Sequence, residues 1–138
     1  MADVQMDAGS WITRALVAEG AVRIVMVEAD EIADAQREAH GLGVDATRLA
    51  AEAAIATVLL TAYVKGDEKL TLQLALNQPE ARFIGEVDPH HRYRGRFDPK
   101  ELDNVDLQDL DGVLFAAKHD GTREVYRGVS AVDHTSIT

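Results

Sequence analysis

The feature that most constrains this chain is a change in the spacing of its apolar residues between positions 45 and 76. From Asp45 to Tyr63 they recur every three or four residues, which is the period of a helix that buries one side. After the turn Lys65-Gly66-Asp67 the period becomes two, with leucine at positions 70, 72, 74 and 76. The sequence therefore predicts a helix that packs against a sheet, and residues 70–76 are one strand of that sheet.

The predicted helix is rich in alanine, and small side chains would let a neighbouring layer approach it closely. The alanines are Ala50, Ala51, Ala53, Ala54 and Ala56. Asp45 is placed to cap the first turn. Because the second half is apolar on every side, we expect this helix to be central and buried. An aspartate at Leu59 would then leave an unpaired charge in the core and unfold the domain.

Two further elements are predicted before this helix. Residues 11–17 and 22–27 flank the turn Ala18-Glu19-Gly20-Ala21 and are rich in branched apolar residues, which indicates a hairpin. The second of these strands shows little polar alternation, so we expect it to be covered on both faces. Residues 28–40 repeat at helical spacing, and Gly41 can end that helix.

Strands are also predicted after residue 76. Residues 80–87 and 91–97 are each bounded by turn residues, and residues 113–118 and 123–129 flank an Asp120-Gly121 turn. The acidic segment between 98 and 111 fits either a helical turn or a packed loop. The predicted order is ββααβββββ, an α+β fold in which a mainly antiparallel sheet packs on two helices.

Length, charge and cysteine content narrow the class of protein. The 138 residues fit one domain, which we expect at residues 11–138 after a flexible leader at 1–10. The net charge of −10 disfavours nucleic acid and anionic membranes as partners. No apolar run reaches the roughly 20 residues of a membrane helix, so we expect a cytoplasmic protein. The absence of cysteine excludes disulfides and thiolate zinc sites.

No residue pattern indicates catalysis, a metal site or a cofactor. The serines Ser10, Ser130 and Ser136 lie near the chain ends, outside any Gly-x-Ser-x-Gly turn. His90 and His91 are adjacent, and adjacent side chains in a strand point to opposite faces. We therefore expect a protein that is not an enzyme, with no catalytic residue, no metal and no cofactor.

Three arginines alternate along one predicted strand. Arg92, Arg94 and Arg96 would share one face and form a basic stripe on an acidic protein, which suits docking of an acidic partner. The alternative is that they neutralise nearby carboxylates through weak surface ion pairs. Those carboxylates are Glu86, Asp88 and Asp98.

Several segments resemble the heat shock protein 33 family. The longest is Lys65-Gly66-Asp67-Glu68-Lys69-Leu70-Thr71-Leu72-Gln73-Leu74. The others are Arg14-Ala15-Leu16, Gly20, Val22-Arg23, Ala35, His40, Arg94-Gly95 and Tyr126-Arg127-Gly128. The resemblance thus covers residues 11–129. Two departures are that Asn77-Gln78-Pro79 replaces a glycine-rich turn, and that the family's linker and cysteine-rich zinc switch domain have no counterpart here.

The resemblance implies the amino-terminal domain of a stress-response holdase, a chaperone that holds unfolding proteins without ATP, here lacking the redox switch. The chain would then be a fragment, a constitutive short form, or a domain reused as an adaptor or regulatory module. Sheet edges left unpaired by the missing segments predict a homodimer. Either the candidate client-binding residues are accessible or most of them form the core; they are Leu72, Leu74, Phe83, Ile84, Tyr93, Phe97 and Phe115.

Overall fold

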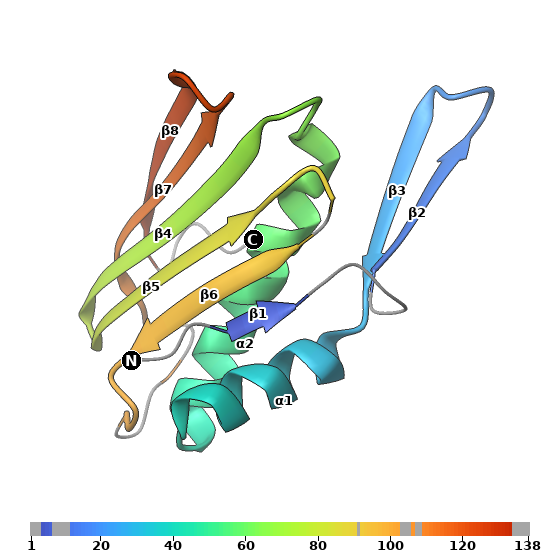
Figure 1. The fold of residues 1–138 in the computed structure, drawn as a ribbon. Helices are drawn as coiled ribbons and strands as arrows, with labels where there is room; N and C mark the ends of the chain where they lie inside the picture. Colours follow the sequence, from blue (N-terminus) through green and yellow to red (C-terminus); the bar gives the residue numbers. More distant parts are fainter. Residues whose placement is uncertain (1–3, 7–11, 91, 103–105, 107–108, 134–138) are drawn as a thin grey trace.

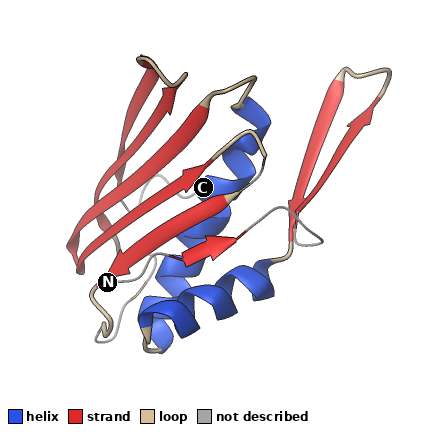
Figure 2. Ribbon diagram, in the orientation of Figure 1, coloured by secondary structure: helices blue, strands red, loops and turns tan. Residues whose placement is uncertain are grey.

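The structure is a computed structural model, and it describes residues 4–6, 12–90, 92–102, 106 and 109–133. Within these residues the chain forms eight strands, two α-helices and one 3₁₀ helix (Figures 1 and 2). In chain order they are β1 (Val4–Met6), β2 (Ile12–Val17), β3 (Val22–Val27), α1 (Ala29–His40), α2 (Val44–Leu59), η1 (Leu60–Tyr63), β4 (Lys69–Gln78), β5 (Glu80–Val87), β6 (Tyr93–Asp98), β7 (Asp111–His119) and β8 (Glu124–Val132). From β2 onward this confirms the predicted order ββααβββββ and the α+β class.

Six strands form one antiparallel sheet in the order β1-β6-β5-β4-β7-β8. Helix α2 packs against β4, β5 and β6, and α1 lies beside α2 near β6 and β1 (Figure 1). Strand β1 lies within the predicted leader and was not expected, because three residues are too short to show an alternation. The remaining leader residues lie outside the described part.

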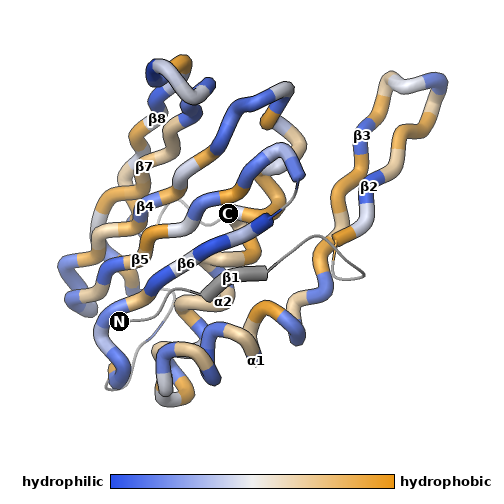
Figure 3. The backbone as a smooth tube through the Cα atoms, viewed as in Figure 1, coloured by the Kyte–Doolittle hydropathy of each residue, from blue (hydrophilic) through white to orange (hydrophobic). Residues whose placement is uncertain are grey.

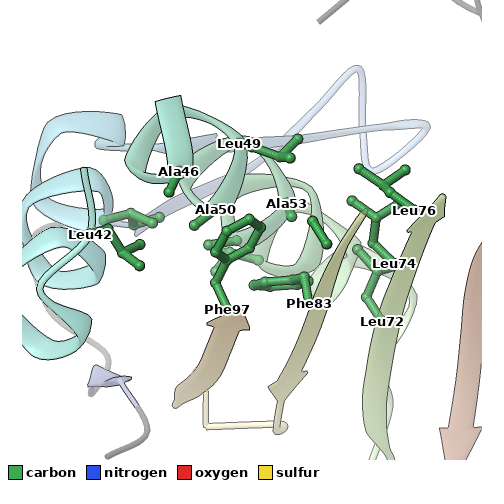
Figure 4. Packing of buried hydrophobic residues seen from close by; sticks show 14 of the residues in the cluster. Leu42, Ala46, Leu49, Ala50, Ala53, Leu72, Leu74, Leu76, Phe83 and Phe97 are labelled. Atoms are coloured by element: carbon green, nitrogen blue, oxygen red, sulfur yellow. The ribbon is translucent and has the colours of Figure 1, made fainter. Parts of the chain in front are cut away.

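The core lies between α2 and one face of the sheet, as the change of period predicts. Leu70, Leu72, Leu74 and Leu76 are all buried, and the residues between them are not. Four alanines of α2 belong to the same buried cluster as Leu72, Leu74, Leu76 and Phe83 (Figure 4), namely Ala46, Ala50, Ala53 and Ala54, whereas Ala56 is exposed. Because alanine carries only a methyl group, the helix can lie close to the sheet.

Helix α2 is buried on one side only, which corrects the expectation for Leu59. That side chain is 39% exposed, whereas Val58 beside it is fully buried. Apolar residues therefore occur on the exposed side of this helix as well, and residue type alone does not identify its buried side. Asp45 does not cap the helix either, because the N-cap is Gly43; Asp45 lies in the first turn, where its charge suits the helix dipole.

Helix α1 ends as predicted at Gly41. This residue has a φ of 60°, and its backbone N–H donates to the carbonyl of Arg37. In the segment between 98 and 111 the described residues outside β6 and β7 form neither helix nor strand, and Leu110 is buried against the core. For those residues the packed loop is the correct alternative.

Strands β2 and β3 form a separate two-stranded sheet that extends away from the six-stranded sheet (Figure 1). The prediction that residues 22–27 are covered on both faces is wrong, because Val22, Ile24 and Met26 are all exposed. The lack of alternation reflects apolar residues on both faces of this strand. The face with Val22, Ile24 and Met26 is open, whereas Val25 and Val27 on the other face are half-buried and Val27 packs against the core.

Candidate protein-binding surface

The face of the six-stranded sheet opposite α2 is a continuous surface, which we call the open face. Its middle row crosses five strands, because each residue lies directly opposite the next in the antiparallel register. The row runs Arg96, Ile84, Gln73, Phe115, Val129, from β6 through β5, β4 and β7 to β8. One parallel row is Asp98, Arg82, Ala75, Val113, Ala131, and the other is Arg94, Glu86, Thr71, Ala117, Arg127.

The two ends of the open face differ in chemistry. The β5 and β6 end carries Arg82, Arg94 and Arg96, while β7 and β8 contribute Val113, Phe115, Val129 and Ala131. Between them, β4 contributes short or flexible side chains. Two hollows lie over this part of the sheet, one of about 430 Å³ toward Arg82 and Arg96 and one of about 540 Å³ toward Phe115 and Arg127. The open face is therefore hollowed at two places.

Of the seven candidate client-binding residues, two lie on the open face. Ile84 is 39% exposed and Phe115 is 37% exposed. The other five belong to the buried core under α2, which is the alternative considered from the sequence. They are Leu72, Leu74, Phe83, Tyr93 and Phe97. The reason is strand parity: each of these five side chains points to the face that α2 covers.

A buried polar cluster fixes β6 against α1. The Nε2 atom of Gln36 donates to the Tyr93 hydroxyl at 2.6 Å, and Nε2 of His40 lies 3.2 Å from the carbonyl oxygen of Gly95. Burial raises the pKa of Tyr93 well above its ordinary value, and the hydrogen bond from Gln36 only partly opposes this. A Cβ on Gly95 would overlap the Tyr93 hydroxyl, so the close packing requires glycine. Side chains that alternate with this cluster, such as Arg94, point to the open face.

The arginine stripe is only partly available. Arg92 precedes β6, and its Nε donates to Oδ2 of Asp88 at 2.7 Å. Arg94 pairs with Oε1 of Glu86 at 2.8 Å. These ion pairs fit the alternative in which the arginines neutralise nearby carboxylates. Arg96 has no hydrogen bond or ion pair with any residue that the structure describes, and it does not pair with Asp98.

The Asp88 carboxylate organises the turn between β5 and β6. It accepts hydrogen bonds from the backbone N–H groups of His90 at 2.9 Å and Arg92 at 3.0 Å. Burial alone would raise the pKa of Asp88, but these bonds and the Arg92 guanidinium together lower it below the ordinary value. The carboxylate is therefore ionised and sets the start of β6.

The hairpin β2–β3 is a second apolar surface, which the sequence reasoning did not propose as a binding surface. It is coloured largely as hydrophobic in Figure 3. The signal that could have revealed it was the scarcity of polar residues in 22–27, where Arg23 alone interrupts the apolar run. The exposed apolar side chains are Leu16, Val17, Val22, Ile24 and Met26, and Leu16 reaches 66% exposure.

Three cationic side chains bind carbonyl groups at the end of η1, and the two that belong to the hairpin fasten it to the body. Arg14 of β2 donates to the carbonyl of Thr61 at 2.7 Å, and Arg23 of β3 donates to that of Ala62. Lys118 of β7 donates to the carbonyl of Tyr63 at 3.2 Å. Positive charge is favourable at a helix C-terminus, where carbonyl groups lack helical partners. The hairpin thus depends on these contacts for its position.

No cluster of three or more histidine, aspartate or glutamate side chains suitable for a metal ion occurs in the described ranges. Within the same residues, no helix has both the length and the apolar character needed to cross a membrane.

Comparison with known proteins agrees with the fold. No curated protein matches the sequence. The chain is similar to the solved structure of the 33 kDa chaperonin (heat shock protein 33 homolog) from Thermotoga maritima, with a TM-score of 0.71 and 23% identity. That match covers 88% of this chain and 44% of the other, so this chain spans less than half the length of that protein. The model of the Hsp33 protein family matches residues 10–138. The chain therefore belongs to the Hsp33 family, a family of chaperones.

Proposed function

We propose that this chain is an ATP-independent holdase that binds unfolding proteins on its open face. The observation that carries the proposal is the row of exposed apolar side chains Ile84, Phe115 and Val129, on a sheet face that none of the described elements covers. Clustered apolar surface is the usual site of protein association. Membership of a chaperone family supports the same function.

Two bulk properties suit such a role. The net charge of −10 opposes aggregation, so a complex with an unfolded client would stay dispersed. The chain has no cysteine, and so no thiol in it can respond to an oxidant. The holding activity that we propose therefore does not depend on oxidation of a thiol in this chain.

Light scattering from a heat-unfolding client protein tests the proposal. The chain should suppress aggregation without nucleotide, and neither ATP nor peroxide should change the effect. The double variant Ile84→Ser/Phe115→Ser should need about tenfold more protein for the same suppression, because two apolar contacts are lost. The matched control is Val44→Ser/Tyr63→Ser, which removes an exposed aliphatic and an exposed aromatic side chain elsewhere.

Lack of suppression at molar excess would overturn the proposal. The adaptor hypothesis predicts instead a saturable, salt-sensitive complex with one native partner that Arg94→Glu weakens. It has less support, because Arg92 and Arg94 are already ion-paired within the chain.

A further inference from the structure

The open face carries unpaired positive charge beside its apolar residues, although the chain as a whole is strongly acidic. Arg82 and Arg96 both line the hollow next to Ile84. Neither has a hydrogen bond or ion pair with the described residues. Asp98 lines the same hollow and lies opposite Arg82 in the β5–β6 register, yet these two described residues do not form an ion pair. Two guanidinium groups are thus free to bind a carboxylate.

The distance between the two ends of the open face determines how far apart two side chains of a bound segment must be to contact both ends. Phe115 and Arg96 lie in one row, on strands separated by β4 and β5. Neighbouring strands lie about 4.8 Å apart, so three intervals amount to about 14 Å. An extended segment advances about 3.3 Å per residue, and about four residues therefore cover this distance.

Extended segments present alternate side chains to the same side. Residues i and i+4 of such a segment therefore face the sheet together. An apolar side chain at one of these positions would lie over Phe115 and Val129, while a carboxylate at the other would reach Arg82 and Arg96. Residue i+2 would lie over β4, where Thr71, Gln73 and Ala75 leave room.

We propose that the open face selects extended client segments in which an apolar residue and an acidic residue stand four positions apart. This inference rests on the proposed holding function and names the class of segment held. Selection by a complementary charge next to an apolar contact gives specificity that apolar surface alone does not.

Fluorescence anisotropy with labelled twelve-residue peptides tests the inference. The peptides consist of glycine, serine and threonine apart from one leucine and one variable residue four positions later. With glutamate at that position, binding should be about threefold tighter than with glutamine, and tighter still than with lysine. Moving glutamate to three positions after leucine should remove the advantage, and added salt should reduce it.

Variants of the chain locate the effect. Arg82→Gln/Arg96→Gln should bind the glutamate and glutamine peptides equally. The matched control Arg37→Gln/Arg48→Gln removes two exposed arginines from α1 and α2 and should keep the preference. Circular dichroism confirms that each variant is folded.

The outcomes separate this inference from the proposed function. Equal binding of all peptides by the unaltered chain, or a preference for lysine, overturns the inference while aggregation suppression still supports the holdase. Suppression without any peptide binding also overturns it. Failure of both peptide binding and suppression removes the holdase proposal as well.

Discussion

Two neighbouring residues of α2 show how a helix divides the core from solvent. Val58 is fully buried on the side of the helix that faces the sheet, whereas Leu59 is 39% exposed. We predict that Val58→Asp unfolds the domain, because an unpaired buried charge costs several kcal/mol. Leu59→Asp should lower the free energy of unfolding by only about 1 kcal/mol. Thermal melting followed by circular dichroism compares the pair, and equal loss of stability would contradict the assignment of helix faces.

Asp88 gives a prediction about pH. The pKa of Asp88 in the folded chain lies below its ordinary value, so the ionised carboxylate stabilises the fold at and above that ordinary value. This contribution is lost as the pH falls through the folded pKa. Asp88→Asn should lower the free energy of unfolding by about 1–3 kcal/mol at pH 7, because two backbone N–H groups and Arg92 lose their charged acceptor.

Urea denaturation at several pH values between 7 and 2 tests the predicted effect of Asp88→Asn on the free energy of unfolding. The difference between Asp88→Asn and the unaltered chain should shrink as the pH is lowered toward and below the folded pKa of Asp88. A difference that stays constant from pH 7 to pH 2 would show that the effect does not come from ionisation of this carboxylate.

At the scale of elements, the hairpin β2–β3 is the part most dependent on single contacts. Arg14 and Arg23 each donate to a carbonyl at the end of η1. In Arg14→Ala/Arg23→Ala the backbone amides of residues 12–27 should exchange with deuterium about tenfold faster, while the melting temperature of the sheet changes little. Arg123→Ala is the control, because Arg123 pairs only locally with Asp120. Unchanged exchange in the double variant would show that other contacts hold the hairpin.

The elements that the sequence predicted best are those whose two sides differ. Leu70 to Leu76 alternate because α2 covers one face of β4 and leaves the other open. Where both sides of a strand carry apolar residues, periodicity does not separate a covered face from an open one. Strand β3 has one open face and one half-buried face, and it was predicted to be covered on both.

The candidate site was predicted only in part for a related reason. Apolar residue type identified all seven client-binding candidates, but only strand parity in the sheet separates Ile84 and Phe115 from the five core residues. Which arginines are already paired depends on cross-strand register. Register comes from tertiary packing and is not visible in the spacing of Arg92, Arg94 and Arg96.

At the scale of the whole molecule, the sheet edges bear on the proposed homodimer. Strand β8 is an edge strand of nine residues, and most of its side chains are exposed. An open edge can pair with a second chain. We predict concentration-dependent dimerisation in sedimentation equilibrium, weakened by Val125→Lys, which places a charge on that edge. A single monomeric species at all concentrations would contradict the dimer.

The alternation along β4 has a consequence for how this chain tolerates change. Even-numbered positions from 70 to 76 point into the core, and positions 71, 73 and 75 point to the open face. Core packing and the proposed client recognition therefore depend on different residues of the same strand. In a saturation scan scored once for folded yield and once for captured client, the two sets should separate by parity, so ligand preference could be redesigned without rebuilding the scaffold.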